Sequence, residues 1–339
     1  MTGIGADRDT DSNADNDPAL AARTGAGTDV VTLGETMALV KADSPGPLSH
    51  VHGLSLGIGG SETNVAIALT RLGTSVTWIG RVGEDSFGDL VLRELRAEGV
   101  RTLCRRDAGG PTGLMVKERR TLEQLKVWYY RAGSAGSRLA PEDISTEAVS
   151  SARLLHVTGI TPGLSATAAA ATFFAVDCAR AMGVTVSFDV NYRAGLWSTD
   201  EAAPVFRALA DKADIVFAGE DEAAIMVGPG DAWAKAARIA TLGPTQVVIK
   251  RGTAGAQAVI DGVDYNQAAV PVKAIDTVGA GDAFVAGYIA ELLVGLPPAG
   301  RLATAARVGA FACLVPGDWE GMPRRSELVL LEATEPVRR

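Results

Sequence analysis

Residues 276–284 read D-T-V-G-A-G-D-A-F and combine a glycine-rich turn, a helix start and a carboxylate. Glycine allows backbone conformations that a Cβ forbids, so we expect the amides of Gly279, Ala280 and Gly281 to converge on one point. The apolar run 283–293 predicts a buried helix directly after the turn. Because a helix N-terminus favours negative charge, the turn is expected to bind an anion.

Asp282 stands beside this expected anion site. A carboxylate next to such a site fits phosphoryl transfer, in which amides hold the moving phosphoryl group and the carboxylate accepts the proton of the attacking hydroxyl. An aspartate here would otherwise be a helix N-cap. The complete glycine-rich motif favours catalysis, so the first hypothesis is a small-molecule kinase with Asp282 as general base.

The elements that must position this motif alternate along residues 29–339. Apolar β-branched runs are followed by helical stretches, a pattern typical of a mostly parallel sheet covered by helices on both faces, in a doubly wound α/β domain. The predicted strands are 30–33, 76–79, 154–157, 184–188, 215–217, 247–249 and 256–260. The predicted helices 63–72, 90–98 and 166–182 are each followed by a glycine, namely Gly73, Gly99 and Gly183, as a left-handed C-cap requires.

Polar residues follow several predicted strands. Asn191 and Arg193 come after the strand 184–188, and Glu222 comes after the strand 215–217. Because the carboxyl ends of the strands in a doubly wound sheet share one edge, where ligands bind, we expect these residues to converge in space.

Two stretches interrupt the alternation. Residues 40–58 contain prolines and glycines without a helix signal, and residues 101–133 contain the period-two alternation of a solvent-facing antiparallel strand pair. We expect them to form a small inserted sheet, which is a lid over the site, a dimer clasp or a structural decoration. Alternation places Tyr129 and Arg131 on one face, and an aromatic ring beside a guanidinium suits a polar anionic ligand, which favours the lid.

Composition narrows the class of protein. The 339 residues carry a formal net charge of -8, which argues against nucleic-acid binding. The three cysteines are scattered, so neither a disulfide framework nor a zinc site is expected, and a reducing cytoplasm fits best. No apolar run of about 18 residues offers a membrane span. Residues 1–28 lack apolar periodicity and are expected to be a disordered tail.

With residues 276–284, and with G-G-S-E-T-N at 59–64 opening the first long helix, the chain resembles the ribokinase/PfkB family of carbohydrate kinases. The resemblance runs from about residue 30 to the last helices. The P-loop motif G-x-x-x-x-G-K-[ST] and the protein-kinase motifs H-R-D and D-F-G are absent from the sequence, which excludes those two kinase classes.

Within the family the chain is similar to kinases of 2-keto-3-deoxygluconate, through G-E at 34–35, P-G-P-L at 45–48, Y-Y-R-A-G-S-A at 129–135 and D-V-N-Y-R at 189–193. The resemblance implies MgATP-dependent phosphorylation of the terminal hydroxyl of a six-carbon keto acid, with Asp282 as base. It implies substrate contacts from Gly60, Asn64, Tyr129, Arg131 and Asp318. It implies ATP contacts from Asn191, Arg193, Lys250, Gly252 and Gly255, and a water-mediated Mg²⁺ contact from Glu222.

Two positions depart from the family pattern. Met115 stands where a tyrosine is common, which removes one hydroxyl contact to the substrate, and Gly219 replaces the asparagine of the N-x-x-E element that ends at Glu222. Arg131 is expected to pair with the carboxylate of an acid substrate, because burying that charge without a partner is unfavourable.

Three hypotheses follow from these residues. The first is a kinase of the keto acid or of its galactose-type epimer, and the second is a neutral-sugar kinase such as a fructokinase or ribokinase, which would not require Arg131. The third is a catalytically silent sugar sensor, against which the intact Asp282 argues. A homodimer through the inserted sheet is expected from the resemblance, and because open sheet edges need covering.

Overall fold

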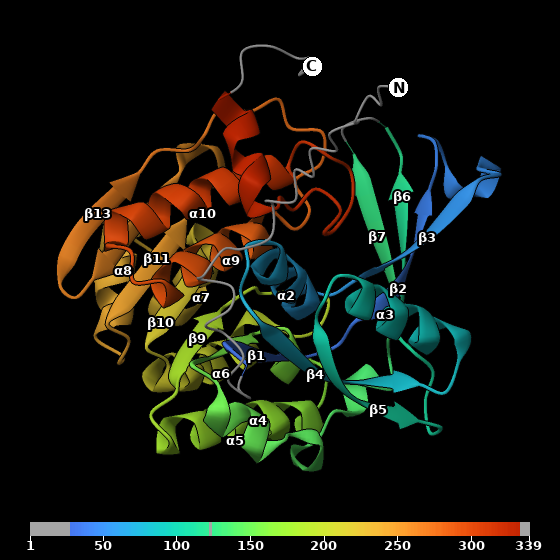
Figure 1. The fold of residues 1–339 in the computed structure, drawn as a ribbon, viewed down its shortest axis with the longest axis horizontal. Helices are drawn as coiled ribbons and strands as arrows, with labels where there is room; N and C mark the ends of the chain where they lie inside the picture. Colours follow the sequence, from blue (N-terminus) through green and yellow to red (C-terminus); the bar gives the residue numbers. More distant parts are fainter. Residues whose placement is uncertain (1–27, 122–123, 333–339) are drawn as a thin grey trace, which may run out of the picture.

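The computed structural model describes residues 28–121 and 124–332. The expected tail lies outside these ranges, except for its last residue. Within the described residues, nine strands form a central sheet (Figure 1). In spatial order they are β13 (Val263–Gln267), β12 (Ala256–Ile260), β11 (Gln246–Lys250), β10 (Ile215–Gly219), β9 (Thr185–Asp189), β8 (Leu154–Thr158), β1 (Val30–Leu33), β4 (Val76–Gly83) and β5 (Arg101–Asp107).

The sheet is mostly parallel, as predicted. Every neighbouring pair from β11 to β5 is parallel, and antiparallel pairing is confined to β11 with β12 and β12 with β13. Strands β1, β4 and β8 are buried at every position, which explains their apolar, β-branched sequences. The parallel register brings the carboxyl ends of β8, β9, β10 and β11 to one edge of the sheet.

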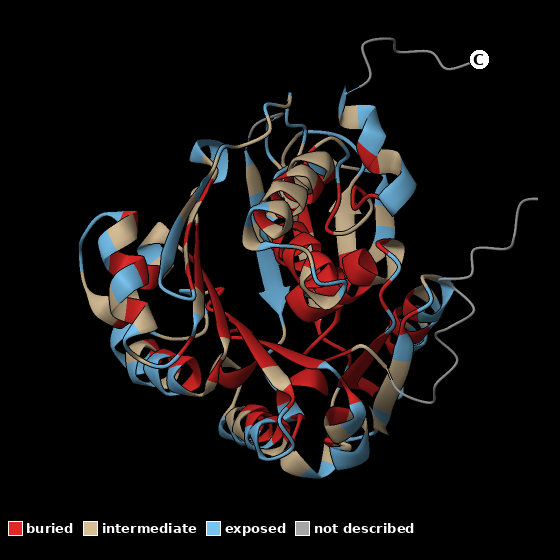
Figure 2. Ribbon diagram, turned by 60° about the vertical axis from the view of Figure 1, so that its left-hand side comes forward, coloured by how far each residue is buried: buried red, intermediate tan, exposed pale blue. Residues whose placement is uncertain are grey.

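Helices cover both faces of the sheet, and each interface buries its own apolar cluster (Figure 2). One layer contains α2 (Ser61–Arg71), α3 (Ser86–Ala97), α9 (Ala280–Leu293) and α10 (Pro298–Ala312). The other contains α4 (Thr146–Ser151), α5 (Ala166–Ala181), α6 (Thr199–Lys212), α7 (Glu220–Val227) and α8 (Ala232–Ala240). Short 3-10 turns are η1 (Leu48–His50), η2 (Gly136–Arg138), η3 (Pro141–Asp143), η4 (Thr161–Gly163), η5 (Gly252–Ala254) and η6 (Arg325–Glu332).

The predicted helix ends are confirmed. Gly73, Gly99 and Gly183 follow the C-cap residues of α2, α3 and α5, with φ of 90°, 79° and 71°. These left-handed conformations favour glycine and end each helix before the next strand. No helix in the described ranges has the length and apolar character that a bilayer crossing requires.

A second sheet of four strands, which we call the lid sheet, lies beside the main body (Figure 1). Its spatial order is β3 (Leu54–Gly59), β2 (Met37–Ala42), β6 (Leu114–Arg119) and β7 (Leu125–Tyr130). β6 and β7 are antiparallel, as their alternation predicted, and Met115 lies opposite Tyr129. The alternation in the sequence therefore marks a true antiparallel pair of strands.

The predicted range of the lid sheet is wrong in one part. Residues 101–107 form β5, which pairs in parallel with β4 at the edge of the central sheet. The reason is that an edge strand is covered incompletely, so β5 carries exposed arginines such as Arg101 and Arg105, and its sequence resembles that of a solvent-facing strand. The lid sheet also begins earlier than predicted, because β2 starts at Met37.

Candidate active site

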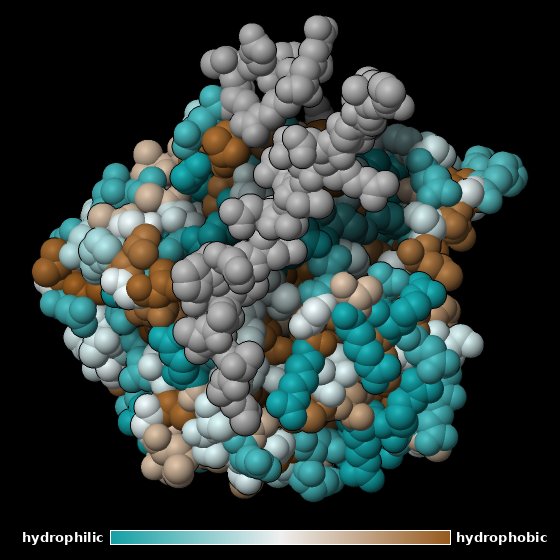
Figure 3. Space-filling view, in the orientation of Figure 1, coloured by the Kyte–Doolittle hydropathy of each residue, from teal (hydrophilic) through white to brown (hydrophobic). Residues whose placement is uncertain are grey.

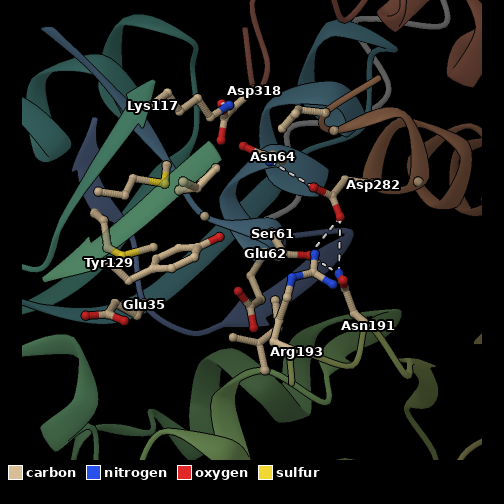
Figure 4. A pocket seen from close by; sticks show the side chains of 18 of the residues that line it. Glu35, Ser61, Glu62, Asn64, Lys117, Tyr129, Asn191, Arg193, Asp282 and Asp318 are labelled. Atoms are coloured by element: carbon tan, nitrogen blue, oxygen red, sulfur yellow. Dashed lines mark hydrogen bonds and ion pairs between the residues drawn. The ribbon is translucent and has the colours of Figure 1, made fainter. Parts of the chain in front are cut away.

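A cavity of about 340 Å³ lies between the lid sheet and the first turns of α2 and α9 (Figure 4). This volume suits a small ligand. The predicted site residues that line it are Gly60, Asn64, Tyr129, Arg131, Asn191, Arg193, Lys250, Gly279, Gly281, Asp282 and Asp318. Four other predicted residues do not line it, namely Glu222, Gly252, Gly255 and Ala280.

The glycine-rich turn forms the N-terminus of α9, as the sequence predicted. Gly279 is the N-cap residue, with φ of 76°, and a Cβ there would lie 2.0 Å from the carbonyl oxygen of Asp318. Gly281 was expected to need the same freedom, but it lies inside the helix and lacks a positive φ. Its Cβ would meet only the Lys250 Nζ, at 3.6 Å, so the second glycine leaves room in the cavity and relieves no backbone strain.

The amides of this turn differ in what they can bind. The Ala280 amide donates to the carbonyl of Thr277 at 3.3 Å, which withdraws it from the predicted anion site. The amides of Gly279, Gly281 and Asp282 have no acceptor within the described part of the chain. Free amides at a helix N-terminus can hold an anionic group, so these three amides are the ones available to bind an anion.

Asp282 is held by side chains from α2. The Ser61 Oγ donates to Oδ1 of Asp282 at 2.7 Å, and the Asn64 Nδ2 donates to Oδ2 at 2.8 Å (Figure 4). Asn191 completes the network, because its Nδ2 donates to the Ser61 Oγ at 2.6 Å. Burial raises the pKa of Asp282 to about 6, although the hydrogen bonds from Asn64 and Ser61 oppose the rise. A carboxyl group with this pKa can accept a proton near neutral pH.

The first turn of α2 also offers an acceptor. The Oδ1 of Asn64 is buried and has no hydrogen-bond partner within residues 28–121 and 124–332. A buried carbonyl oxygen without a donor is unfavourable, so a ligand hydroxyl is its natural partner. Packing explains the glycine at position 60, because a Cβ there would lie 2.5 Å from the Glu35 carbonyl oxygen.

Lys250 enters the cavity from the end of β11. Its Nζ lies 2.7 Å from both carboxylate oxygens of Asp189, at the end of β9. Burial lowers the pKa of Lys250, but the carboxylates of Asp189 and Glu222 outweigh it and the pKa is raised. Gly252 and Gly255, predicted to approach a nucleotide, are the first residue and the C-cap of the turn η5, with φ of 54° and 87°.

Glu222 connects two segments behind the cavity. Its Oε2 accepts from the Gly219 amide at 2.6 Å and its Oε1 accepts from the Tyr192 amide at 3.1 Å.

The described ranges contain no cluster of three or more His, Cys, Asp or Glu side chains that could hold a metal ion. His156 is buried in β8, where burial lowers its pKa to about 3.

Arg131 already has a partner. Its Nε lies 2.7 Å from Oε2 of Glu35, whose side chain is 0% exposed, and the Ser134 hydroxyl also donates to Glu35. From the sequence we expected Arg131 to pair with a substrate carboxylate, and Glu35 was not identified as its partner. Tyr129 lies at the same end of the cavity, with its ring centroid 5.7 Å from the Arg131 Cζ.

Asp318 is likewise paired. It forms a buried ion pair with Lys117, which projects from the inner face of β6. Burial raises the pKa of Asp318, and the charge of Lys117 opposes this effect. Lys117, Ser61 and Glu62 all line the cavity and were not singled out from the sequence. Ser61 and Glu62 lie within the motif G-G-S-E-T-N, which was the available signal.

Comparison with known proteins gives consistent results. Residues 27–325 match the family described as pfkB family carbohydrate kinase. The chain is 36% identical over 311 residues to the 2-dehydro-3-deoxygluconokinase of Bacillus subtilis, covering 88% of this chain and 94% of that protein. It is 36% identical over 281 residues to the fructokinase of Klebsiella pneumoniae, covering 80% of this chain and 90% of that protein.

A solved structure shares the fold. The crystal structure of a PfkB protein from Polaromonas sp. JS666 superimposes with a TM-score of 0.81 and 36% identity, covering 88% of this chain and 99% of that one. The two motifs through which the sequence resembled this family, residues 276–284 and 59–64, lie at the N-termini of α9 and α2. The chain therefore belongs to the PfkB family of carbohydrate kinases.

Proposed function

We propose that this carbohydrate kinase transfers the γ-phosphoryl group of ATP to the terminal hydroxyl of 2-keto-3-deoxygluconate or its galactose-type epimer. The observation that carries the proposal is the position of Asp282. Its buried carboxylate lies in the cavity, in the same helical turn as the free amides of Gly279 and Gly281. A base and an anion site are thereby adjacent, as in-line phosphoryl transfer requires.

Asp282 accepts the proton in this reaction. The hydroxyl oxygen of the sugar attacks the γ-phosphorus, the bond from that phosphorus to the ADP oxygen breaks, and the hydroxyl proton passes to the Asp282 carboxylate. The hydrogen bonds from Ser61 and Asn64 fix the direction of that carboxylate. The free amides of α9 stabilise the charge on the transferred group.

Cationic side chains at the rim suit the phosphates of ATP. Arg193 is exposed, and its guanidinium donates to the neighbouring Tyr192 carbonyl at 3.0 Å. It can therefore engage phosphate without first breaking an ion pair. Lys250 and Asn191 line the same side of the cavity. Neither Gly252 nor Gly255 lines the cavity, so their proposed contact to ATP depends on their place at the turn η5.

The donor set fits a magnesium ion that is held mostly by phosphate and water. Mg²⁺ commonly keeps several waters and uses few protein ligands. Asp189 and Glu222 are the carboxylates beside Lys250, and Glu222 would act through water. When bound, the ion would neutralise phosphate charge and so assist the amides of α9.

The lid side of the cavity supports a deoxy acid as substrate. Met37, Met115 and Val127 form an apolar wall there, which suits a CH₂ group better than a hydroxyl. Arg131 donates from Nε and Nη2 to a single oxygen of Glu35, and a guanidinium has five N–H groups, so it keeps donors for a substrate carboxylate.

The same pair favours a second candidate, a neutral-sugar kinase. Because Glu35 already neutralises Arg131, a substrate without charge would leave no cation unpaired at this end of the cavity. Steady-state kinetics on a panel of both keto acids, fructose and ribose separates the two. We expect the keto acids to give the highest kcat/KM. Turnover of fructose or ribose without turnover of the acids would overturn the proposal, and no turnover of any sugar would favour a sensor.

We also propose that the outer face of the lid sheet pairs with a second copy of the chain. Leu54, Leu56, Trp128 and Tyr130 lie on that face and are 42–64% exposed. Figure 3 shows hydrophobic residues along this margin of the molecule. Exposed apolar faces of this kind commonly mark an interface.

Sedimentation velocity tests the dimer. Leu56→Glu is expected to convert a dimer to a monomer. The matched control is Val329→Glu, which changes an apolar residue of η6 that is 44% exposed and lies outside the lid sheet, and which should stay dimeric. A monomeric wild-type protein at micromolar concentration would refute this part of the proposal.

A further inference from the structure

Glu62 is an acid of the cavity that the proposed phosphoryl transfer does not use. It lies in the first turn of α2, is 1% exposed and lines the cavity. Its Oε1 accepts hydrogen bonds from the Thr158 Oγ1 at 2.6 Å and the Thr161 Oγ1 at 2.7 Å. Its Oε2 has no hydrogen-bond partner among the described residues. One oxygen is therefore fixed, and the other is available to a ligand.

The neighbouring backbone leaves space for this carboxyl group. A Cβ on Gly34 would lie 2.4 Å from the Glu62 Cδ and 2.6 Å from its Oε1. Any larger residue at position 34 would displace the carboxyl group. The two threonines and the glycine come from the ends of β8, η4 and β1, so three segments hold one side chain in place. In Figure 4 Glu62 lies between Glu35 and Asn191.

The protonation state of Glu62 determines the balance of charge at its end of the cavity. Burial raises the pKa of Glu62. The hydrogen bonds from Thr158 and Thr161, the amide of Glu62 itself and, to the smallest extent, the Arg131 charge oppose that rise. Arg131 is shared with Glu35, so an ionised Glu62 would leave this end of the cavity with two carboxylates against one guanidinium. The remaining charged groups that line the cavity are Lys117, Arg193, Lys250, Asp282 and Asp318.

The two threonine hydrogen bonds lower the pKa of Glu62, but their geometry is also compatible with the neutral acid. A carboxylic acid has a carbonyl oxygen that accepts, as Oε1 does twice, and a hydroxyl that donates. An ionised Oε2 could only accept, and its charge would repel an anionic substrate at close range. The free oxygen is thus useful to an acid substrate in its protonated form.

We propose that Glu62 determines specificity for acid substrates, as a neutral carboxylic acid whose Oε2–H donates a hydrogen bond to the carboxylate or keto oxygen of the bound sugar acid. The inference rests on the proposed function and adds the group that reads the acid end of the substrate. Its consequence is that ionisation of Glu62 at high pH weakens binding of the acid and leaves the transfer step intact.

Two variants test the proposal. Glu62→Gln keeps an acceptor for the threonines and places an N–H donor at the free position, but it cannot ionise. Glu62→Met has a similar volume and lacks the donor. KM and kcat for 2-keto-3-deoxygluconate are measured from pH 6 to pH 9, and the affinity for the keto acid without ATP is measured by calorimetry.

The expected results differ for each protein. In wild type, KM for the acid rises at high pH, and in Glu62→Gln it stays near the low-pH value. Glu62→Met raises KM roughly ten- to hundredfold, the range expected for losing a hydrogen bond to a charged group, with kcat within threefold. The calorimetric affinity changes in parallel.

Two outcomes would overturn the inference alone. If Glu62→Gln loses as much affinity as Glu62→Met, the carboxylate form is the one required, and if Glu62→Met matches wild type, Glu62 does not contact the substrate. Should Glu62→Met fail to fold in a melting experiment, the comparison of Glu62→Gln with wild type at high pH decides. If wild type neither binds nor phosphorylates either keto acid, the proposed function fails first and the inference with it.

Discussion

Asn64 donates from its Nδ2 to the Oδ2 of Asp282 at 2.8 Å, across 218 positions of sequence. The contact joins the first turn of α2 to the first turn of α9, so each helix orients the functional group of the other. The Oδ1 of the same Asn64 is buried and has no hydrogen-bond partner among the residues that the structure describes. A sugar hydroxyl at this place could donate to Asn64 or to Asp282, and the proposed function has the two residues act together on the reacting end of the substrate.

Removing the Asn64 side chain is expected to impair both effects. In Asn64→Ala, kcat/KM should fall at least roughly tenfold, as for a lost hydrogen bond to a charged group. The pKa of Asp282 should rise, because the Asn64 hydrogen bond lowers it, and the acid limb of the pH profile should move to higher pH. Thr70→Ala, at the far end of α2 and outside the cavity, is the control and should retain wild-type kinetics. An unmoved acid limb in Asn64→Ala would contradict this role.

The pKa of Asp282 predicts the pH dependence of activity. The base must be ionised, and burial raises its pKa to about 6, so kcat/KM should fall as the pH drops through 6. A profile that stays flat down to pH 5 would show that another group accepts the proton.

The contribution of Asp282 to the free energy of unfolding should change with pH in the direction opposite to activity. The folded-state pKa of Asp282 lies above the ordinary aspartate value of 3.8, so the folded protein binds this proton more tightly than the unfolded chain does. The ionised form therefore disfavours folding above pH 6 by roughly 3 kcal/mol, and this effect is relieved as the pH falls toward 3.8. Asp282→Asn should thus unfold with a higher free energy than wild type at pH 8, and the difference should vanish near pH 4.

Variants of the Glu35 and Arg131 pair distinguish an effect on substrate binding from an effect on stability. Arg131→Ala should raise KM for the keto acid far more than KM for ATP. It should also lower the free energy of unfolding by roughly 3–5 kcal/mol, because Glu35 is left buried and unpaired.

A double variant serves as the control for this prediction. Arg131→Met with Glu35→Gln removes both charges, so stability should recover while the KM for the acid stays high. Wild-type affinity for the acid in the double variant would remove Arg131 from the substrate site.

The two glycines of the α9 turn should respond differently to alanine. Gly279→Ala forces a Cβ into the left-handed region and against the Asp318 carbonyl oxygen, so it should lower the free energy of unfolding by roughly 2 kcal/mol or more. Gly281→Ala meets only the Lys250 Nζ, at 3.6 Å, and should melt at or above the wild-type temperature. Equal melting temperatures for the two variants would contradict the assigned conformations.

Local sequence patterns predicted most of the fold because they encode short-range physics. The strands β1 and β12 occupy the predicted residues, and α9 begins within the predicted glycine-rich turn. The strand β5 was misplaced because its arginines reflect an exposed sheet edge, a property of the folded neighbourhood.

The partners within the site could not be read from the chain in the same way. The ion pairs of Arg131 with Glu35 and of Lys117 with Asp318 join residues 96 and 201 positions apart. Their residue types are unremarkable taken singly, and only the fold brings them together. The backbone role of Gly281 was also misjudged, because a glycine in a signature motif can be selected for space alone.

The rate of phosphoryl transfer by Asp282→Asn in a single turnover, with ATP and the preferred sugar acid saturating, tests the central claim most directly. Loss of a general base typically reduces such a rate by about 10²–10⁴-fold, and we expect a loss in this range with substrate affinity retained. A variant that transfers phosphate within a few-fold of the wild-type rate would show that residue 282 is not the base.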